Sequence, residues 1–287
     1  MRKSVFAVTI VLAIALVLAI PVGAITGNWV DDSDHPFVGL VVFYDEAGEF
    51  VQRCSGALIS PTKFLTAGHC VTDPTVEIVS ARVYFQQDAG AHYDPATELD
   101  PVTGYPEYCA AGTLGTLCAT SDELYNFGFP NPLPNTHDAG LVILDQRIDL
   151  PEYGQLPTAG LLNDLSTSRG QKNTIFTVSG YGLSYKTEEH SVLGNLSFRI
   201  RLMATSTLVN LNSSLLNDGF NLQTQGNGDG RGGTCSGDSG GPVFLGGPNS
   251  NLIVAVTSFG LNELCRGTDF AYRIDRTEVL NWINNPQ

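Results

Sequence analysis

Short runs of β-branched and aromatic residues recur along the chain, and clusters of Gly, Pro, Asn and Asp separate them. Such runs predict strands, and the turn-forming residues between them predict frequent chain reversals. Their spacing is typical of an all-β barrel or sandwich. We predict strands at residues 39–44, 80–86, 140–144, 174–179, 252–259 and 270–274.

Two segments depart from this strand pattern. Near the C-terminus, Asp275 and Glu278 form an N-capping pattern ahead of the apolar residues within 279–283, which predicts a helix. Residues 88–129 are rich in Gly, Pro, Tyr and Asp, and they predict a long surface excursion.

The first 24 residues predict a secretory signal peptide. Basic residues precede an apolar run at residues 5–20, and small residues suited to cleavage end at Ala24. An uncleaved membrane anchor is the alternative, but a helix of this run spans only roughly 24 Å of the ~30 Å hydrocarbon core. We expect a leader at 1–24, a secreted domain at 25–287, and no membrane contact after cleavage.

Composition narrows the function classes. The chain has 287 residues, 43% of them hydrophobic, and a formal net charge of -14. This apolar content excludes a disordered chain, and the acidity disfavours nucleic-acid partners, which bind Lys and Arg. In an oxidising compartment the six cysteines predict three disulfides rather than a metal site. We expect no cofactor and a monomer.

Three residues have the chemistry that nucleophilic catalysis requires. Ser239 lies among glycines that allow a sharp turn exposing its hydroxyl, but a neutral serine is a poor nucleophile without a base. His69 can be that base, and Asp138, just before an apolar strand, can accept the second imidazole N–H. The backbone N–H groups of Gly237 and Ser239 can both point at a developing oxyanion.

Each of these residues also has a purely structural interpretation. A histidine beside Cys70 can be structural or a zinc ligand, but no second His or Cys stands at ligand spacing. Asp145 is a rival for Asp138, and Ser239 can be a mere turn residue. We favour the catalytic interpretation because all three residue types are present together.

The sequence around these residues resembles the chymotrypsin/trypsin family of serine proteases. Thr66-Ala67-Gly68-His69-Cys70 looks like that family's histidine box, and Gly237-Asp238-Ser239-Gly240-Gly241-Pro242 is its serine box without a substitution. The chain order His, Asp, Ser is also the family's. The resemblance runs from Ile25 to the predicted helix.

The resemblance implies a fold and an activity. The fold is all-β, with two packed six-stranded antiparallel β-barrels at roughly 25–155 and 156–287, a C-terminal α-helix, and the active site in the cleft between the barrels. The activity is that of a secreted serine endopeptidase acting on protein or peptide substrates. A non-catalytic binding protein on the same fold is the alternative, and an α/β-hydrolase esterase would need the order nucleophile, acid, histidine.

The resemblance also implies disulfides and an activation step. Cys54–Cys70 and Cys235–Cys265 correspond to family disulfides, which leaves Cys109–Cys118 as a pair without a family counterpart. The family needs a free aliphatic N-terminus whose ammonium pairs with the aspartate before the nucleophile. Here Ile25 and Asp238 match those positions, and cleavage after Ala24 would itself create the activating N-terminus.

Substrate specificity stays open at this stage. The expected substrate-binding residues are Gly233, Thr234, Ser258, Phe259, Gly260 and Asp269. Trypsin-like members have an aspartate where this chain has Gly233, whereas Asp269 stands where the family usually has glycine. Asp269 can therefore select basic side chains, or it can point to solvent and leave a pocket for apolar or aromatic side chains.

Overall fold

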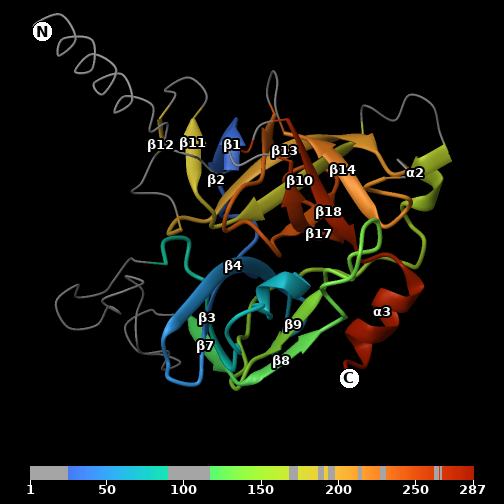
Figure 1. Ribbon diagram of the computed structural model, residues 1–287. Coiled ribbons are helices and arrows are strands. Elements are labelled where there is room, and N and C mark those ends of the chain that lie inside the picture. The colour runs from blue at the N-terminus through green and yellow to red at the C-terminus, as the bar shows by residue number, and fades with distance from the viewer. Residues whose placement is uncertain are drawn as a thin grey trace, which may run out of the picture.

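The computed structural model describes residues 25–89, 117–167, 174–186, 191–192, 198–212, 215–226, 231–261, 265 and 267–287. In these residues two curved antiparallel sheets lie one above the other in Figure 1, and helix α3 (Thr277–Asn284) packs beside the lower one. Among the described residues, no helix combines the length and apolar character needed to cross a membrane. The predicted leader at 1–24 lies outside this description.

The N-terminal barrel is one antiparallel sheet in the order β7-β6-β3-β4-β5-β9-β8. Its strands are β3 (Val38–Tyr44), β4 (Phe50–Leu58), β5 (Lys63–Thr66), β6 (Ser80–Tyr84), β7 (Cys118–Ser121), β8 (Glu123–Asn126) and β9 (Gly140–Ile143). Only Asp122 separates β7 from β8, so one bent strand supplies both ends of the sheet, and the barrel is nearly closed. Counted in this way, the barrel has the six strands expected.

The C-terminal barrel follows the order β10-β16-β17-β18-β14-β13-β2 and closes where β10 also pairs with β13. Its strands are β10 (Ile175–Gly180), β13 (Leu202–Asn210), β14 (Asn221–Gln225), β16 (Pro242–Leu245), β17 (Ile253–Gly260) and β18 (Thr268–Arg273), with β2 (Trp29–Asp31) added at the edge of β13. A small sheet joins β1 (Ile25–Gly27), β11 (Ser184–Lys186), β12 (Ser191–Val192) and β15 (Gly232–Gly233). The predicted two-barrel, all-β fold class is confirmed.

Apolar side chains fill both barrels and continue between them. Strand β3 pairs on both edges and is buried at every position, so both of its faces are covered. The first core contains Phe64 and Tyr84 of the N-terminal barrel together with Phe244 of the C-terminal barrel, all 0% exposed. Phe176 belongs to a separate core inside the second barrel. Burying one such ring contributes roughly 1.5–3 kcal/mol, so the shared core holds the barrels in register.

The C-terminal helix is present, but its predicted cap is wrong. Helix α3 begins at Thr277 with Arg276 at the N-cap, and no side chain caps it. The Asp275 carboxylate is buried and instead pairs with Arg273 at 2.8 Å and accepts the N–H of Leu162 at 2.8 Å. The aspartate is therefore committed to tertiary contacts that its sequence pattern does not reveal.

The predicted surface excursion at 88–129 is also wrong in part. Strands β7 and β8 lie within it and complete the N-terminal barrel, while residues 90–116 lie outside the described part of the chain. The pattern concealed these strands because each is only four residues long. Two short elements were not predicted, the 3-10 helix η1 (Gly68–Cys70) and helix α2 (Asn163–Thr167).

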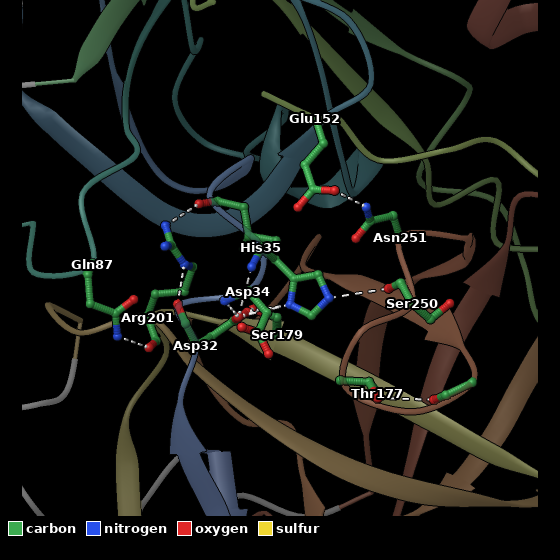
Figure 2. A network of polar contacts seen from close by, with 12 residues as sticks. Asp32, Asp34, His35, Gln87, Glu152, Thr177, Ser179, Arg201, Ser250 and Asn251 are labelled. Atoms are coloured by element: carbon green, nitrogen blue, oxygen red, sulfur yellow. Dashed lines mark hydrogen bonds and ion pairs between the residues drawn. The ribbon is translucent and has the colours of Figure 1, made fainter. Parts of the chain in front are cut away.

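A buried polar network connects the N-terminal segment to both barrels (Figure 2). Asp32 and His35 are 0% exposed, and His35 Nδ1 lies 2.9 Å from Asp32 Oδ1. Ser179 of β10 donates to the same carboxylate, and Arg201 Nε donates to the Asp32 carbonyl at 2.9 Å. Burial alone would raise the pKa of Asp32, but the His35 contact, with Ser179 and Arg201, holds that pKa below its ordinary value.

Replacing Ser179 by alanine is expected to lower the free energy of unfolding by about 1.5–3 kcal/mol, because a buried carboxylate loses a hydrogen bond. Ser206→Ala is the matched control, since the buried Ser206 hydroxyl donates to the neutral carbonyl of Gln225 at 2.9 Å. For Ser206→Ala we expect the free energy of unfolding to fall by about 1 kcal/mol. Denaturant unfolding of both variants measures the two values.

The pH dependence separates the two variants further. Since folding lowers the pKa of Asp32, its stabilisation is present above the ordinary pKa of 3.8 and is lost as pH falls through the lower folded value. The cost of Ser179→Ala should therefore shrink in acid, whereas the cost of Ser206→Ala should not. If the two variants lost equal free energy of unfolding at neutral pH, or if the loss for Ser179→Ala did not change with pH, the assigned hydrogen bond from Ser179 to the Asp32 carboxylate would be contradicted.

Candidate active site

Pairing of β5 with β9 brings His69 and Asp138 together. Thr66 pairs with Gly140 in this ladder, so residues just after β5 and just before β9 lie at the same end of the sheet. His69 follows β5 in helix η1, and Asp138 precedes β9. The His69 backbone N–H donates to Asp138 Oδ1 at 2.8 Å, and the ring Nδ1 lies 2.9 Å from Asp138 Oδ2.

Asp138 is 1% exposed. Burial alone would raise its pKa, but the contact with His69 and a hydrogen bond from Ser258 hold the pKa below its ordinary value. Ser258 Oγ of β17 lies 2.5 Å from Asp138 Oδ2, so the aspartate is also held by the other barrel. A carboxylate can only accept here, so His69 Nδ1 carries the proton and Nε2 is left as the basic nitrogen.

The loop that contains Ser239, residues 234–241 between β15 and β16, is called the serine loop here, and it packs directly against the histidine box. Gly240 has φ +76°, and a Cβ there would lie 2.0 Å from Thr66 Oγ1 and 2.7 Å from Ala67 N, so only glycine fits. Ser239, one residue earlier, is held by the N–H of Ser55, which donates to its carbonyl oxygen at 2.8 Å. Within the described residues, no hydrogen bond joins the Ser239 hydroxyl to the His69 ring. Such contacts are often loose before substrate binds.

Two N–H groups of the serine loop are left unbonded. The neighbouring N–H groups of Asp238, Gly240 and Gly241 all donate to backbone carbonyls. In the described part of the chain, those of Gly237 and Ser239 have no protein acceptor. Leu183 N–H donates to Ser236 O at 3.0 Å, and because a trans peptide is planar, this turns the Gly237 N–H the opposite way. Two donors placed in this way can receive an oxyanion.

Asp238 is a buried carboxylate beside Ile25. Strand β1 lies between β11 and β15, which buries Ile25 to 1% exposure and brings its backbone N–H to the Asp238 carboxylate. The N–H groups of Gly182 and Cys235 donate to the same carboxylate at 2.8 and 3.0 Å. Burial raises the pKa of Asp238 to about 7. No Lys, Arg or His side chain of the described residues forms an ion pair with it.

A pocket of about 360 Å³ opens beside Ser239. Of the expected substrate-binding residues, its lining includes Thr234, Ser258, Phe259, Gly260 and Asp269. Gly233 is not in this lining but lies against Asp269, since a Cβ at Gly233 would meet Asp269 Oδ2 at 2.5 Å.

Asp269 is held on the wall of this pocket. Its Oδ2 accepts the N–H of Thr234 at 2.9 Å, and Asp269 is paired with Gly260 in the β17–β18 ladder. Burial raises the pKa of Asp269 to about 7. The pocket is therefore acidic when this carboxyl is ionised.

The disulfide predictions are confirmed where the structure describes both partners. Cys54–Cys70 joins β4 to η1, and Cys235–Cys265 joins the serine loop to the segment before β18. Cys118 is also disulfide-bonded, but its predicted partner Cys109 lies outside the described residues. His69 lies within 4.8 Å of the Cys54 and Cys70 sulfurs, yet these form a disulfide and offer no thiolate to a metal ion.

Three further residues at the site were not found from the sequence. The ring of Phe129 lies 5.8 Å from the His69 ring, Leu183 orients the peptide before Gly237, and Ser55 contacts the serine loop from the opposite barrel. Ser55 stood beside a recognised cysteine, but nothing in the local pattern points to a partner 182 residues away.

The two packed barrels form the chymotrypsin-like fold, which is the fold of trypsin-like serine proteases. The family model for trypsin matches residues 25–114 and 118–283, and the chain belongs to the trypsin family.

Similar proteins include insect serine proteases. The Spaetzle-processing enzyme of Drosophila melanogaster is 27% identical over 72% of this chain and 52% of its own length. CLIP domain-containing serine protease B9 of Anopheles gambiae is 26% identical over 76% of this chain and 52% of its own length. The chain thus spans about half the length of these two relatives.

Solved structures show the same fold at low identity. HL collagenase aligns with a TM-score of 0.60 and 19% identity, covering 90% of this chain and 96% of that one. Human heparin binding protein aligns with a TM-score of 0.58 and 23% identity, covering 93% of this chain and 98% of that one.

Proposed function

We propose that this chain is a serine endopeptidase that hydrolyses peptide bonds of protein or peptide substrates through an acyl-enzyme intermediate. The proposal rests mainly on one observation, which is that the histidine box of the first barrel and the serine loop of the second barrel pack against each other. His69 and Asp138 are in contact on the first barrel, and the loop that contains Ser239 comes from the second and packs against the histidine box.

The chemistry follows from these positions. His69 Nε2 accepts the Ser239 proton as Oγ attacks the substrate carbonyl carbon, and Asp138 stabilises the resulting imidazolium. The N–H groups of Gly237 and Ser239 stabilise the oxyanion. The imidazolium then protonates the leaving amine, and a water activated by the neutral His69 hydrolyses the ester.

Labelling with a fluorophosphonate probe, combined with casein hydrolysis, tests the proposal. We expect one adduct, located by mass spectrometry on Ser239, and loss of caseinolytic activity in proportion to labelling. A folded chain that neither takes the label nor hydrolyses casein would instead support the alternative of a non-catalytic protein on the protease fold.

We infer that export and activation are a single step. A leader at 1–24 removed after Ala24 would leave Ile25 as a free N-terminus of a secreted domain at 25–287. The Asp238 carboxylate, buried and without a cationic side-chain partner among the described residues, is placed to receive that ammonium.

We infer that Asp269 makes the pocket select basic side chains. The carboxyl lines the pocket beside Thr234 and Gly260, where a Lys or Arg side chain of the substrate can reach it. Burial raises its pKa to about 7, so the pocket gains negative charge as pH rises through this value.

This assignment predicts a pH-dependent preference. From about pH 6 to about pH 8 the ionised fraction of a group with this pKa rises about tenfold, so the ratio of kcat/KM for Lys over Phe substrates should rise similarly. Any effect of pH on the acyl-transfer steps is common to both substrates and cancels in the ratio. Asp269→Asn is expected to give a low ratio that does not change with pH. A flat ratio in the wild type, or no cleavage after Lys or Arg, would contradict the assignment.

A further inference from the structure

Ser55 of strand β4 contacts two peptide groups of the serine loop from the opposite barrel. Its backbone N–H donates to the carbonyl oxygen of Ser239 at 2.8 Å, and its hydroxyl donates to the carbonyl oxygen of Gly237 at 2.8 Å. The Ser55 hydroxyl also accepts the N–H of Tyr181 at 2.9 Å. With Ser55 0% exposed, these two protein partners set the direction of its O–H bond.

Gly237 is the residue of this loop that most needs such support. Its φ of +93° lies in the region that favours glycine, and glycine has no side chain to pack and limit rotation. Leu183 holds the peptide before it, through the Ser236 carbonyl. The peptide after Gly237 is held by the Ser55 hydroxyl at its carbonyl and by the Asp238 N–H at Cys235 O. The direction of the Gly237 N–H depends on both flanking peptides.

The space around Ser55 is closely packed. A Cβ at Gly180 would lie 3.0 Å from Ser55 Oγ, and a Cβ at Gly241 would lie 3.3 Å from Ser55 Cβ. The glycines on both sides let the serine loop and strand β10 approach the hydroxyl. If the hydroxyl is removed, the Gly237 carbonyl therefore loses its donor on a side of the peptide with little room for a replacement water.

We propose that Ser55 is a positioning residue for the oxyanion hole. Its hydroxyl holds the Gly237–Asp238 peptide so that the Gly237 N–H points at the position where the substrate oxyanion forms. Ser55 itself touches no substrate atom and acts only through Gly237. The inference rests on the proposed function and adds a contact from the first barrel to a hole built on the second, so that docking of the barrels completes the hole.

The test compares Ser55→Ala with Ser121→Ala. The buried Ser121 hydroxyl also donates to a backbone carbonyl of the N-terminal barrel, Ile143 O at 2.6 Å, but that bond is made within the barrel and touches no part of the serine loop. For Ser55→Ala we expect kcat to fall about tenfold with KM within twofold, because a donor is misaligned rather than deleted. Ser121→Ala is expected to keep wild-type kcat and KM.

A peptide aldehyde gives the readout specific to the oxyanion hole. It adds to Ser239 and places an oxyanion in the hole, so its affinity should fall by the same factor as kcat/KM in Ser55→Ala. The affinity of a non-covalent pocket ligand, benzamidine, should stay unchanged. Ser55→Gly, which also lacks the hydroxyl but keeps the N–H bond to Ser239, should behave like Ser55→Ala. It serves as the second variant if the alanine protein is poorly folded.

The outcomes separate this inference from the proposed function. Wild-type protein that binds no aldehyde covalently would overturn the proposed function and this inference with it. Wild-type protein that forms the adduct, with Ser55→Ala and Ser55→Gly within twofold of it in kcat and aldehyde affinity, would overturn this inference alone. Parallel loss of benzamidine affinity would also overturn it, because that result indicates general collapse of the pocket.

Discussion

Replacing Ser239 by alanine is expected to lower kcat/KM for peptide substrates by a factor of about 10⁴ to 10⁶, the range general to serine-protease triads. The alanine variant has no atom that can form the acyl-enzyme. Its residual activity would come from direct attack by water on a bound substrate whose oxyanion is still stabilised by the hole. The loop itself should be unchanged, because the backbone carbonyl at this position still accepts the N–H of Ser55. Steady-state kinetics on one chromogenic peptide, with protein freed of any wild-type contaminant, measures the loss.

Combination with His69→Ala tests whether the two residues act as one unit. Each single variant and the double variant should lose nearly the same activity, since a base without its nucleophile contributes little. Ser206→Ala, a buried serine in β13, is the control for serine removal and should keep full kcat/KM. Additive losses, or Ser239→Ala with wild-type activity, would contradict the mechanism.

Replacing Asp238 by asparagine is expected to lower kcat/KM by between about 10² and 10⁴. Breaking a buried ion pair typically costs about 3–5 kcal/mol, and each 1.4 kcal/mol corresponds to a factor of ten. The asparagine side chain could still accept a hydrogen bond from Gly182 or Cys235, but in a chain that begins at Ile25, as we propose, it would leave the ammonium of Ile25 buried without a counter-charge. The adjoining Gly237 and Ser239 would then lose their fixed positions.

An extended N-terminus should reproduce this loss. A chain that keeps Ala24 has an amide in place of the Ile25 ammonium, so the Asp238 carboxyl stays unpaired with a pKa raised to about 7 by burial. We expect both the Asp238→Asn protein and the extended chain to be folded and weakly active, with equal losses. Edman sequencing of the secreted active protein should begin at Ile25. Full activity in a chain that begins elsewhere would contradict the activation proposal.

Much of the architecture was predictable because it rests on local patterns. Strands at 39–44, 140–144 and 252–259 are long apolar runs bounded by turn residues, and all three form. Strands β7 and β8 were not predicted, because a four-residue strand in a polar stretch has too few apolar residues to show an alternating pattern. These strands are stabilised by pairing with β6 and β9. Asp275 failed as a cap because a buried arginine outcompeted the helix N-terminus for its carboxylate.

The sequence by itself determined the family and the order of the candidate triad, because both depend on residue types at fixed short spacings, and the resemblance to that family implied the two placed disulfides. The tertiary structure alone decided how the halves meet. It placed Asp269 in the pocket wall and the Ser55 hydroxyl on a carbonyl 182 residues away. These contacts join different barrels or strands, and their geometry is set by barrel closure and packing, which no short stretch of sequence encodes.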